Sequence, residues 1–90
     1  MEFEWDPAKA EENLRVHGVN FAVVAGVFED DNALTIEDFD AEGEQRFRTL
    51  GIDDLGRLLV VVYTYRGGKI RLISAWKANK KQEKEYAKRR

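Results

Sequence analysis

Two runs of apolar residues near the C-terminus form the strongest pattern in the chain. Residues 57–66 and 69–77 are rich in β-branched and aromatic side chains, and Gly67 and Gly68 separate them. Strand-forming runs joined by two glycines are typical of a β-hairpin with a tight turn. This hairpin is the most hydrophobic part of the chain, so we expect it at the centre of a sheet.

The N-terminal part predicts a short extended segment at residues 3–5, followed by helices. Asp6 is a suitable N-cap because its carboxylate accepts a backbone N–H, and Pro7 fits the first helical position. The first helix is expected to end near His17, because Gly18 suits the position after a helix C-terminus.

Apolar spacing indicates which faces of two successive helices are buried. The stripe on the first helix is thin and consists of Ala10, Leu14 and His17. Asn20 can cap the second helix, whose apolar residues recur at i, i+3, i+4 and i+7: Phe21, Val24, Ala25 and Phe28. This spacing is typical of an α-helix that packs on a core.

The remaining segments predict two more strands and a final helix. Residues 33–38 and 44–52 read as strands, with an acidic turn at residues 39–43 and another turn at residues 53–56. The last helix is expected from Asn79 to about Lys88, with Gln82 completing a capping box.

This order of elements predicts one α+β domain over residues 1–90. We expect two N-terminal helices, a four-stranded antiparallel sheet with a short additional N-terminal strand, and a C-terminal helix.

Charge is distributed unevenly along the chain. Residues 1–65 hold 15 acidic and 5 basic side chains, a balance of −10, whereas residues 66–90 hold 2 acidic and 10 basic side chains, a balance of +8. This asymmetry fits a basic surface for an anionic partner, and it equally fits two ends that neutralise each other in the fold.

Several function classes find no support in the sequence. The chain has no cysteine, no metal-ligand cluster, no glycine-rich phosphate loop and no Ser-His-Asp constellation, so neither a cofactor nor a metal is expected. No apolar run approaches the length of a membrane span, and the acidic N-terminus is unlike a signal peptide. We therefore expect a protein without membrane contact, and the absence of cysteine fits a reducing cytosol.

Basic and aromatic residues alternate along the predicted strands and their turns. The cations are Arg46, Arg48, Arg57, Arg66, Lys69, Arg71 and Lys77, interleaved with Tyr63 and Tyr65. Guanidinium groups match phosphate oxygens and aromatic rings stack on bases, which suits RNA. The alternative is a solvated sheet face on which the cations pair with carboxylates.

The single histidine, His17, has two readings as well. Histidine is the side chain best suited to proton transfer near neutral pH. Histidine at a helix C-terminus is also a common capping or packing residue. The basic C-terminal helix can likewise follow a phosphate backbone or simply keep its lysines in water.

Matches spread along nearly the whole chain resemble the BrnT toxins. They include the opening Phe3-Glu-Trp-Asp6, the segment His17-Gly-Val19, the pair Gly56-Arg57, the segment Val62-Tyr-Thr64 and the segment Ile73-Ser-Ala75. Further matches are Lys9, Asn13, Phe21, Val27, Phe28, Asp30, Glu44, Arg46, Gly51, Arg66, Arg71, Ala78, Glu83 and Tyr86. The resemblance implies a RelE-like ribonuclease fold and the toxin of a bacterial type II toxin–antitoxin system.

The resemblance also implies an activity and partners. A metal-independent endoribonuclease is expected to inhibit translation by cleaving RNA. A BrnA-type antitoxin is expected to neutralise it in a complex of two toxins and two antitoxins, which binds operator DNA through the antitoxin.

The chain departs from this family at Trp76, because the family usually reads Ile-Ser-Ala-Arg where this chain reads Ile-Ser-Ala-Trp. Tryptophan cannot neutralise charge on a reacting phosphate, so we expect weak or absent cleavage. The candidate site residues are Arg57, Arg66, Arg71 and Lys77 for charge stabilisation, Tyr63, His17 and Glu44 for proton transfer, and Trp76. Non-catalytic alternatives are a module that only binds the antitoxin and one that only binds RNA.

Overall fold

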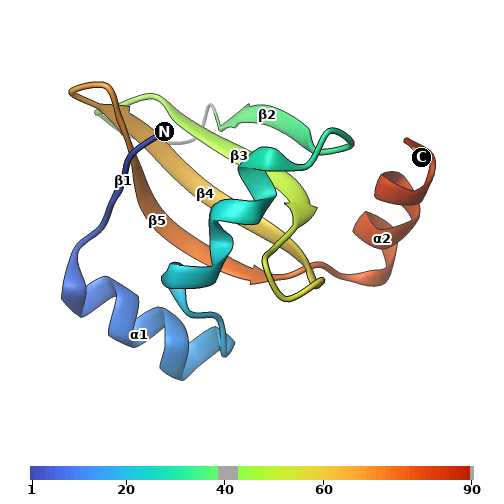
Figure 1. The fold of residues 1–90 in the computed structure, drawn as a ribbon, viewed down its shortest axis with the longest axis horizontal. Helices are drawn as coiled ribbons and strands as arrows, with labels where there is room; N and C mark the ends of the chain where they lie inside the picture. Colours follow the sequence, from blue (N-terminus) through green and yellow to red (C-terminus); the bar gives the residue numbers. More distant parts are fainter. Residues whose placement is uncertain (39–42, 90) are drawn as a thin grey trace.

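The computed structural model describes residues 1–38 and 43–89 (Figure 1). The elements in chain order are β1 (Phe3–Glu4), α1 (Pro7–His17), the 3₁₀ helix η1 (Phe21–Glu29), β2 (Leu34–Asp38), β3 (Arg46–Ile52), β4 (Leu58–Arg66), β5 (Lys69–Lys77) and α2 (Lys80–Ala87). The described ranges contain a mixed α+β fold with one five-stranded sheet and three helices. The expected turn at residues 39–43 lies, apart from Gly43, outside the described residues.

The sheet has the strand order β1-β5-β4-β3-β2. Strands β2 to β5 form the predicted antiparallel meander, and the central hairpin turns through Gly67 and Gly68, whose φ angles are 60° and 81°. Two consecutive positive φ angles fit a type I′ turn, whose twist matches that of the flanking strands. The prediction missed one pairing, because β1 joins this sheet beside β5 in parallel.

Two helices lie near the same half of the molecule, and the third stands apart. In Figure 1, η1 crosses one face of the sheet, α1 (blue) lies beyond the β5 edge, and α2 (red) lies on the far side of the molecule. The contacts between elements agree with this arrangement, since η1 packs on β3 and α1 packs on β5. Within the described residues, no helix is long and apolar enough to cross a membrane.

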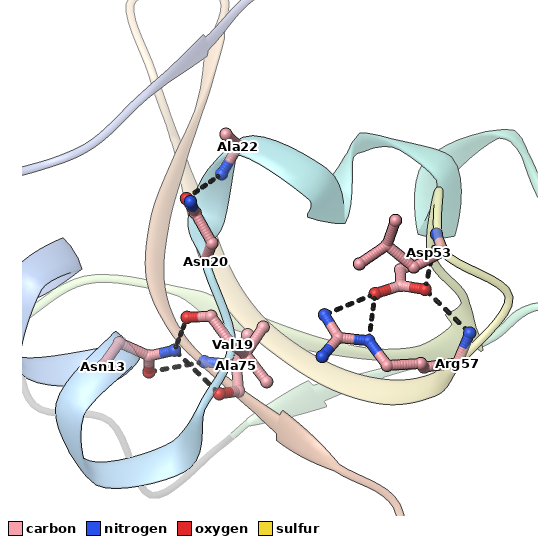
Figure 2. Close-up of polar contacts among 8 residues, drawn as sticks. Asn13, Val19, Asn20, Ala22, Asp53, Arg57 and Ala75 are labelled. Atoms are coloured by element: carbon pink, nitrogen blue, oxygen red, sulfur yellow. Dashed lines mark hydrogen bonds and ion pairs between the residues drawn. The ribbon is translucent and has the colours of Figure 1, made fainter.

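The second helix is a 3₁₀ helix, so the predicted α-helical spacing was wrong. Its buried side chains are Phe21, Val24 and Val27, which recur every three residues, whereas Ala25 and Phe28 are only partly buried. A 3₁₀ helix has three residues per turn, so these three side chains align on one face. The local cap was predicted correctly, because the Asn20 side chain accepts a hydrogen bond from the Ala22 backbone N–H (Figure 2).

The first helix has the predicted ends but a different buried face. Asp6 caps it, Pro7 begins it, and Gly18 follows in a left-handed conformation with φ of 69°. Of the expected apolar stripe, Ala10 packs against the core, but Leu14 is 50% exposed, and the one buried residue of the helix is Asn13. The helix therefore meets the sheet through a polar side chain.

Apolar side chains form two clusters within the described residues. The larger one lies between the sheet and the N-terminal helices, and the fully buried Leu59, Val61 and Leu72 belong to it. In the smaller one, Tyr86 of α2 packs with residues such as Leu50. The capping box of α2 was predicted correctly, and the Tyr86 hydroxyl donates to Asp30, which ties α2 to the end of η1.

Tyr63 lies in the larger cluster and is only 3% exposed. Its hydroxyl is 2.8 Å from the hydroxyl of Thr49, which in turn is 2.8 Å from the hydroxyl of Thr35. Its ring contacts those of Phe28 and Phe47. Burial raises the pKa of Tyr63 above its ordinary value of 10.0, and the hydrogen bond with Thr49 partly opposes the rise.

This raised pKa predicts a loss of stability in alkali. The unfolded chain releases the tyrosine proton near pH 10.0, whereas the folded chain keeps it to higher pH. The contribution of Tyr63 is therefore complete below pH 10.0 and is lost as the pH rises through the folded-state pKa. The free energy of unfolding, measured with denaturant at several alkaline pH values, should decline less for Tyr63→Phe than for the parent protein. The exposed Tyr65 supplies the control, and an equal effect of Tyr65→Phe would contradict this assignment.

Candidate active site

The C-terminal half of β5 forms an unusual sheet edge. Strand β1 pairs with β5 only at Ile70 and Arg71, so it does not extend along the rest of β5. Helix α1 lies along this remaining part instead. Trp76 and Lys77, two of the residues expected at the site, are located here.

Asn13 joins α1 to this edge (Figure 2). Its amide nitrogen donates to the backbone carbonyls of Val19 and Ala75, at 2.9 Å each, and its side-chain oxygen accepts from the Ala75 backbone N–H at 3.0 Å. The same oxygen accepts from the Ser74 hydroxyl at 3.1 Å. Asn13 therefore pairs with both backbone groups of Ala75 as a neighbouring strand would.

This connection brings the C-terminus of α1 close to Trp76. The ring centroids of His17 and Trp76 are 6.0 Å apart, with the ring planes at 43°. On β3, the guanidinium carbon of Arg48 lies 5.8 Å from the centre of the Trp76 ring, within the range of a cation–π contact. Trp76 also packs against the smaller apolar cluster, so its ring is only partly exposed.

Two adjoining pockets lie along this edge and together form a groove, which we call the α1–β5 groove. One pocket is lined by Val16, His17, Trp76 and Lys77. The other is lined by Lys9, Glu12, Asn13, Val16, His17, Ile73 and Ser74. His17 and Val16 line both pockets. The groove thus combines an imidazole, two ammonium groups and a carboxylate beside an aromatic ring.

The sequence interpretation gave no role to Lys9 or Glu12. A signal was present, because Lys9, Glu12, Asn13, Val16 and His17 recur at i, i+3, i+4, i+7 and i+8. This spacing places residues on one face of an α-helix. The helix meets the sheet through this mostly polar face. The spacing of apolar residues alone therefore does not reveal this face.

Arg57 lies outside the groove and is held by Asp53 at the turn before β4 (Figure 2). Its Nε and a terminal nitrogen lie 2.9 Å from one oxygen of the buried Asp53 carboxylate. The other oxygen accepts from the backbone N–H groups of Leu55 and Arg57, at 3.0 and 2.8 Å. This geometry gives Arg57 a clear structural role in the turn.

Arg66 and Arg71 also have carboxylate partners. Arg66 lies 3.1 Å from Glu44, and Arg71 on β5 lies 2.6 Å from Glu4 on β1. Arg57 precedes β4 and Arg66 is its last residue, so their Cα atoms are about 30 Å apart at ~3.3 Å per residue. The three arginines are therefore not gathered around one phosphate-sized site.

The expected proton-transfer residues are separated in the same way. Glu44 pairs with Arg66, and the Tyr63 hydroxyl is enclosed in the core next to Thr49. Of the eight expected site residues, the groove brings together His17, Trp76 and Lys77. Among the residues that the structure describes, no group of three or more His, Asp or Glu side chains is arranged to hold a metal ion.

Comparisons with known proteins agree with this fold. The profile of the family described as "Ribonuclease toxin, BrnT, of type II toxin-antitoxin system" matches residues 5–82. The solved structure of the Brucella abortus ribonuclease toxin BrnT superposes with a TM-score of 0.70 and 24% sequence identity, covering 89% of this chain and 99% of that one. No curated protein sequence matches. The family match covers most of the chain, and this chain therefore belongs to the BrnT family of ribonuclease toxins of type II toxin–antitoxin systems, a family that implies an antitoxin partner.

Proposed function

We propose that this chain is an endoribonuclease toxin that works without a metal ion and binds the reacting phosphate of RNA in the α1–β5 groove. The observation that carries this proposal is the position of His17, which lies beside Trp76 and lines both pockets of the groove. Lys9 and Lys77 line the same groove and supply positive charge for an RNA phosphate.

The proposed reaction uses the RNA 2′-hydroxyl as the nucleophile. Its oxygen bonds to the adjacent phosphorus while the bond from phosphorus to the 5′ oxygen breaks, which leaves a 2′,3′-cyclic phosphate and a 5′-hydroxyl. His17 accepts the 2′ proton, and the ammonium group of Lys9 donates a proton to the leaving oxygen. Lys77 stabilises the charge on the non-bridging oxygens.

The cations outside the groove have a supporting role in this proposal. Arg66 and Arg71 are assigned to the RNA backbone away from the reacting phosphate, because neither lines the groove and each is paired with a carboxylate. Arg57 is assigned to the turn rather than to chemistry, because the buried Asp53 holds its guanidinium.

Trp76 is expected to leave this enzyme weak. The family usually has arginine at this position, and an indole offers neither a positive charge nor a fork of N–H donors. In the cell, we propose a cytoplasmic toxin that inhibits translation and is neutralised by a BrnA-type antitoxin. The proposed complex holds two copies of each protein and represses its own operon through the antitoxin.

Trp76 also supports a second candidate function. A chain that keeps the fold and lacks the arginine can still bind an antitoxin and take part in repression without cleaving RNA. The cleavage experiment separates the two functions.

The proposed function predicts slow cleavage of single-stranded RNA that continues in EDTA and produces cyclic phosphate ends. We expect His17→Ala to lower the rate by about 100-fold or more, because a positioned general base contributes roughly 10²–10⁴-fold. End-group analysis of the products and single-turnover kinetics provide the measurement. Arg15→Ala on the same helix is the control and should leave the rate unchanged. Loss of activity in EDTA would contradict the mechanism, and absence of cleavage even with arginine at position 76 would favour the non-catalytic function.

A further inference from the structure

Trp76 and Trp5 are both partly exposed, and they differ in what surrounds them. Trp5 packs against the larger apolar cluster, with its ring 6.0 Å from that of the buried Phe21. Trp76 instead lines an open pocket with Val16, His17 and Lys77. A large aromatic side chain in a pocket provides a planar apolar surface for a ligand.

Two cationic side chains lie close to this ring. Arg48 lies over it at 5.8 Å, and its side chain is 45% exposed, with the nearest Asp38 oxygen at a loose 3.5 Å. Lys77 follows Trp76 directly and lines the same pocket. A ligand with both an aromatic ring and negative charge fits these surroundings.

The rest of the groove narrows the choice of ligand. Among the described residues that line the two pockets, Glu12 is the only carboxylate, and Lys9 lines the same pocket as Glu12. The apolar contribution beside Trp76 comes from Val16, which is 54% exposed. A single flat ring with a flanking phosphate fits this combination better than an extended apolar peptide, because the described lining of the pocket at Trp76 offers two rings and a single aliphatic side chain.

We propose that Trp76 is a stacking platform for one unpaired nucleobase of single-stranded RNA. The base stacks on the part of the indole that faces the pocket, next to the exposed His17 ring. The phosphates on either side of the base contact Lys77 and Arg48. This inference rests on the proposed function for RNA as the ligand, but it concerns binding and requires no cleavage.

Stacking on an aromatic side chain tolerates any base, because every base has a π face. The platform is therefore expected to hold single-stranded RNA with little sequence preference. Arginine at position 76 would bind the phosphate more strongly and the base less. The arginine that is usual in the family thus favours a phosphate contact, whereas Trp76 favours a base contact.

The test uses a short single-stranded RNA with 2′-O-methyl groups, which lack the nucleophilic hydroxyl and so cannot be cleaved. We expect Trp76→Leu to weaken its binding by about tenfold, within the range that alanine substitutions give for base stacking, and Trp76→Phe to retain most of it. Removing the base at one position, while keeping its sugar and phosphate, should weaken binding by a similar factor for the parent protein and have little effect on Trp76→Leu.

Two further arms separate stacking from other interactions. Lys77→Met should weaken binding of the intact and the base-free RNA equally, because it removes a phosphate contact. A fully paired duplex of the same sequence should bind less tightly than the single strand. Thermal melting of each variant verifies that it is folded.

The outcomes distinguish this proposal from the proposed function. Equal affinity of the intact and the base-free RNA at every position would overturn the stacking platform, even if the enzyme cleaves RNA. Unchanged binding by a folded Trp76→Leu would overturn it as well. Base-dependent binding through Trp76 without any cleavage by the parent or by Trp76→Arg would support the platform and overturn the ribonuclease activity.

Discussion

Replacing Trp76 with arginine is expected to raise the rate of RNA cleavage by about 10²–10³-fold, because loss of one charge-stabilising donor typically lowers catalytic rates by this factor. The reacting phosphate carries additional charge on its non-bridging oxygens in the transition state. A guanidinium group at position 76 would present a positive charge and a fork of N–H donors to those oxygens. Tryptophan supplies neither.

The geometry of the groove supports an effect of this size. Position 76 lies beside His17 and lines the same pocket as Lys77. A guanidinium there would act next to the group that accepts the 2′ proton. Arg48 does not take the place of this guanidinium, because it lies over the indole ring and is paired with Asp38.

The measurement compares Trp76→Arg with Trp76→Met under single-turnover conditions in EDTA. Methionine is the matched control because it also removes the indole but adds no charge. We expect only the arginine variant to gain activity, and we expect its expression without an antitoxin to arrest growth. Equal rates for the two variants would assign the effect to loss of tryptophan, and unchanged rates for both would remove position 76 from the catalytic site.

Folding of both variants has to be verified first. Trp76 packs against the smaller apolar cluster, so either replacement removes apolar contacts there. Thermal melting of the two proteins should give similar midpoints. A lower midpoint for Trp76→Arg alone would point to repulsion between the new guanidinium and Arg48.

Local signals explain the parts of the fold that the sequence predicted well. Asp6, Pro7 and Gly18 define the ends of α1 through groups that lie within a few residues of each other. The tight turn of the β4–β5 hairpin depends on two glycines. Each of these features requires only neighbouring residues, and the meander follows from consecutive pairing.

Features that depend on distant contacts were not predictable in the same way. The type of η1 depends on its packing against β3, where Gly51 approaches Val27 so closely that an added Cβ would lie 3.1 Å from a Val27 methyl carbon. The parallel pairing of β1 joins Phe3 with Ile70, which are far apart in the chain. Local patterns carry no information about such pairs.

Which of the candidate site residues lie together could not be predicted from the sequence for the same reason. His17, Trp76 and Lys77 meet because α1 lies along the β5 edge. The ion pairs of Arg66 with Glu44 and of Arg71 with Glu4 join residues that are far apart in the sequence, so composition alone could not separate paired cations from free ones. The charge asymmetry therefore fits partial neutralisation within the fold as well as an anionic partner.

Replacing Asn13 with alanine is expected to lower the free energy of unfolding by about 2–4 kcal/mol, since each buried polar group left unpaired costs roughly 1–3 kcal/mol. Asn13 is 5% exposed, and its side chain pairs with the carbonyls of Val19 and Ala75 and with the Ala75 N–H. Alanine would leave these backbone groups without partners at a position that no strand covers.

Denaturant unfolding measures this loss, and Asn20→Ala is the matched control. Asn20 is also an asparagine that bonds to the backbone, but it is exposed and caps η1. Loss of such a cap typically costs about 1 kcal/mol. A cost for Asn13→Ala no greater than that for Asn20→Ala would show that the connection between α1 and β5 adds little to stability.

Asn13→Asp separates the shape of the side chain from its hydrogen bonding. The aspartate retains the oxygen that accepts from the Ala75 N–H but, when ionised, places a second oxygen against two carbonyls. This repulsion raises the pKa of the new carboxyl in the folded state, so the variant should be more stable at low pH and lose stability as the pH rises through that pKa. Hydrogen exchange at the Ala75 amide gives the local readout. Faster exchange in Asn13→Ala than in Asn13→Asp would locate the lost contact at the edge that holds His17 against Trp76, because only the aspartate keeps an acceptor for that N–H.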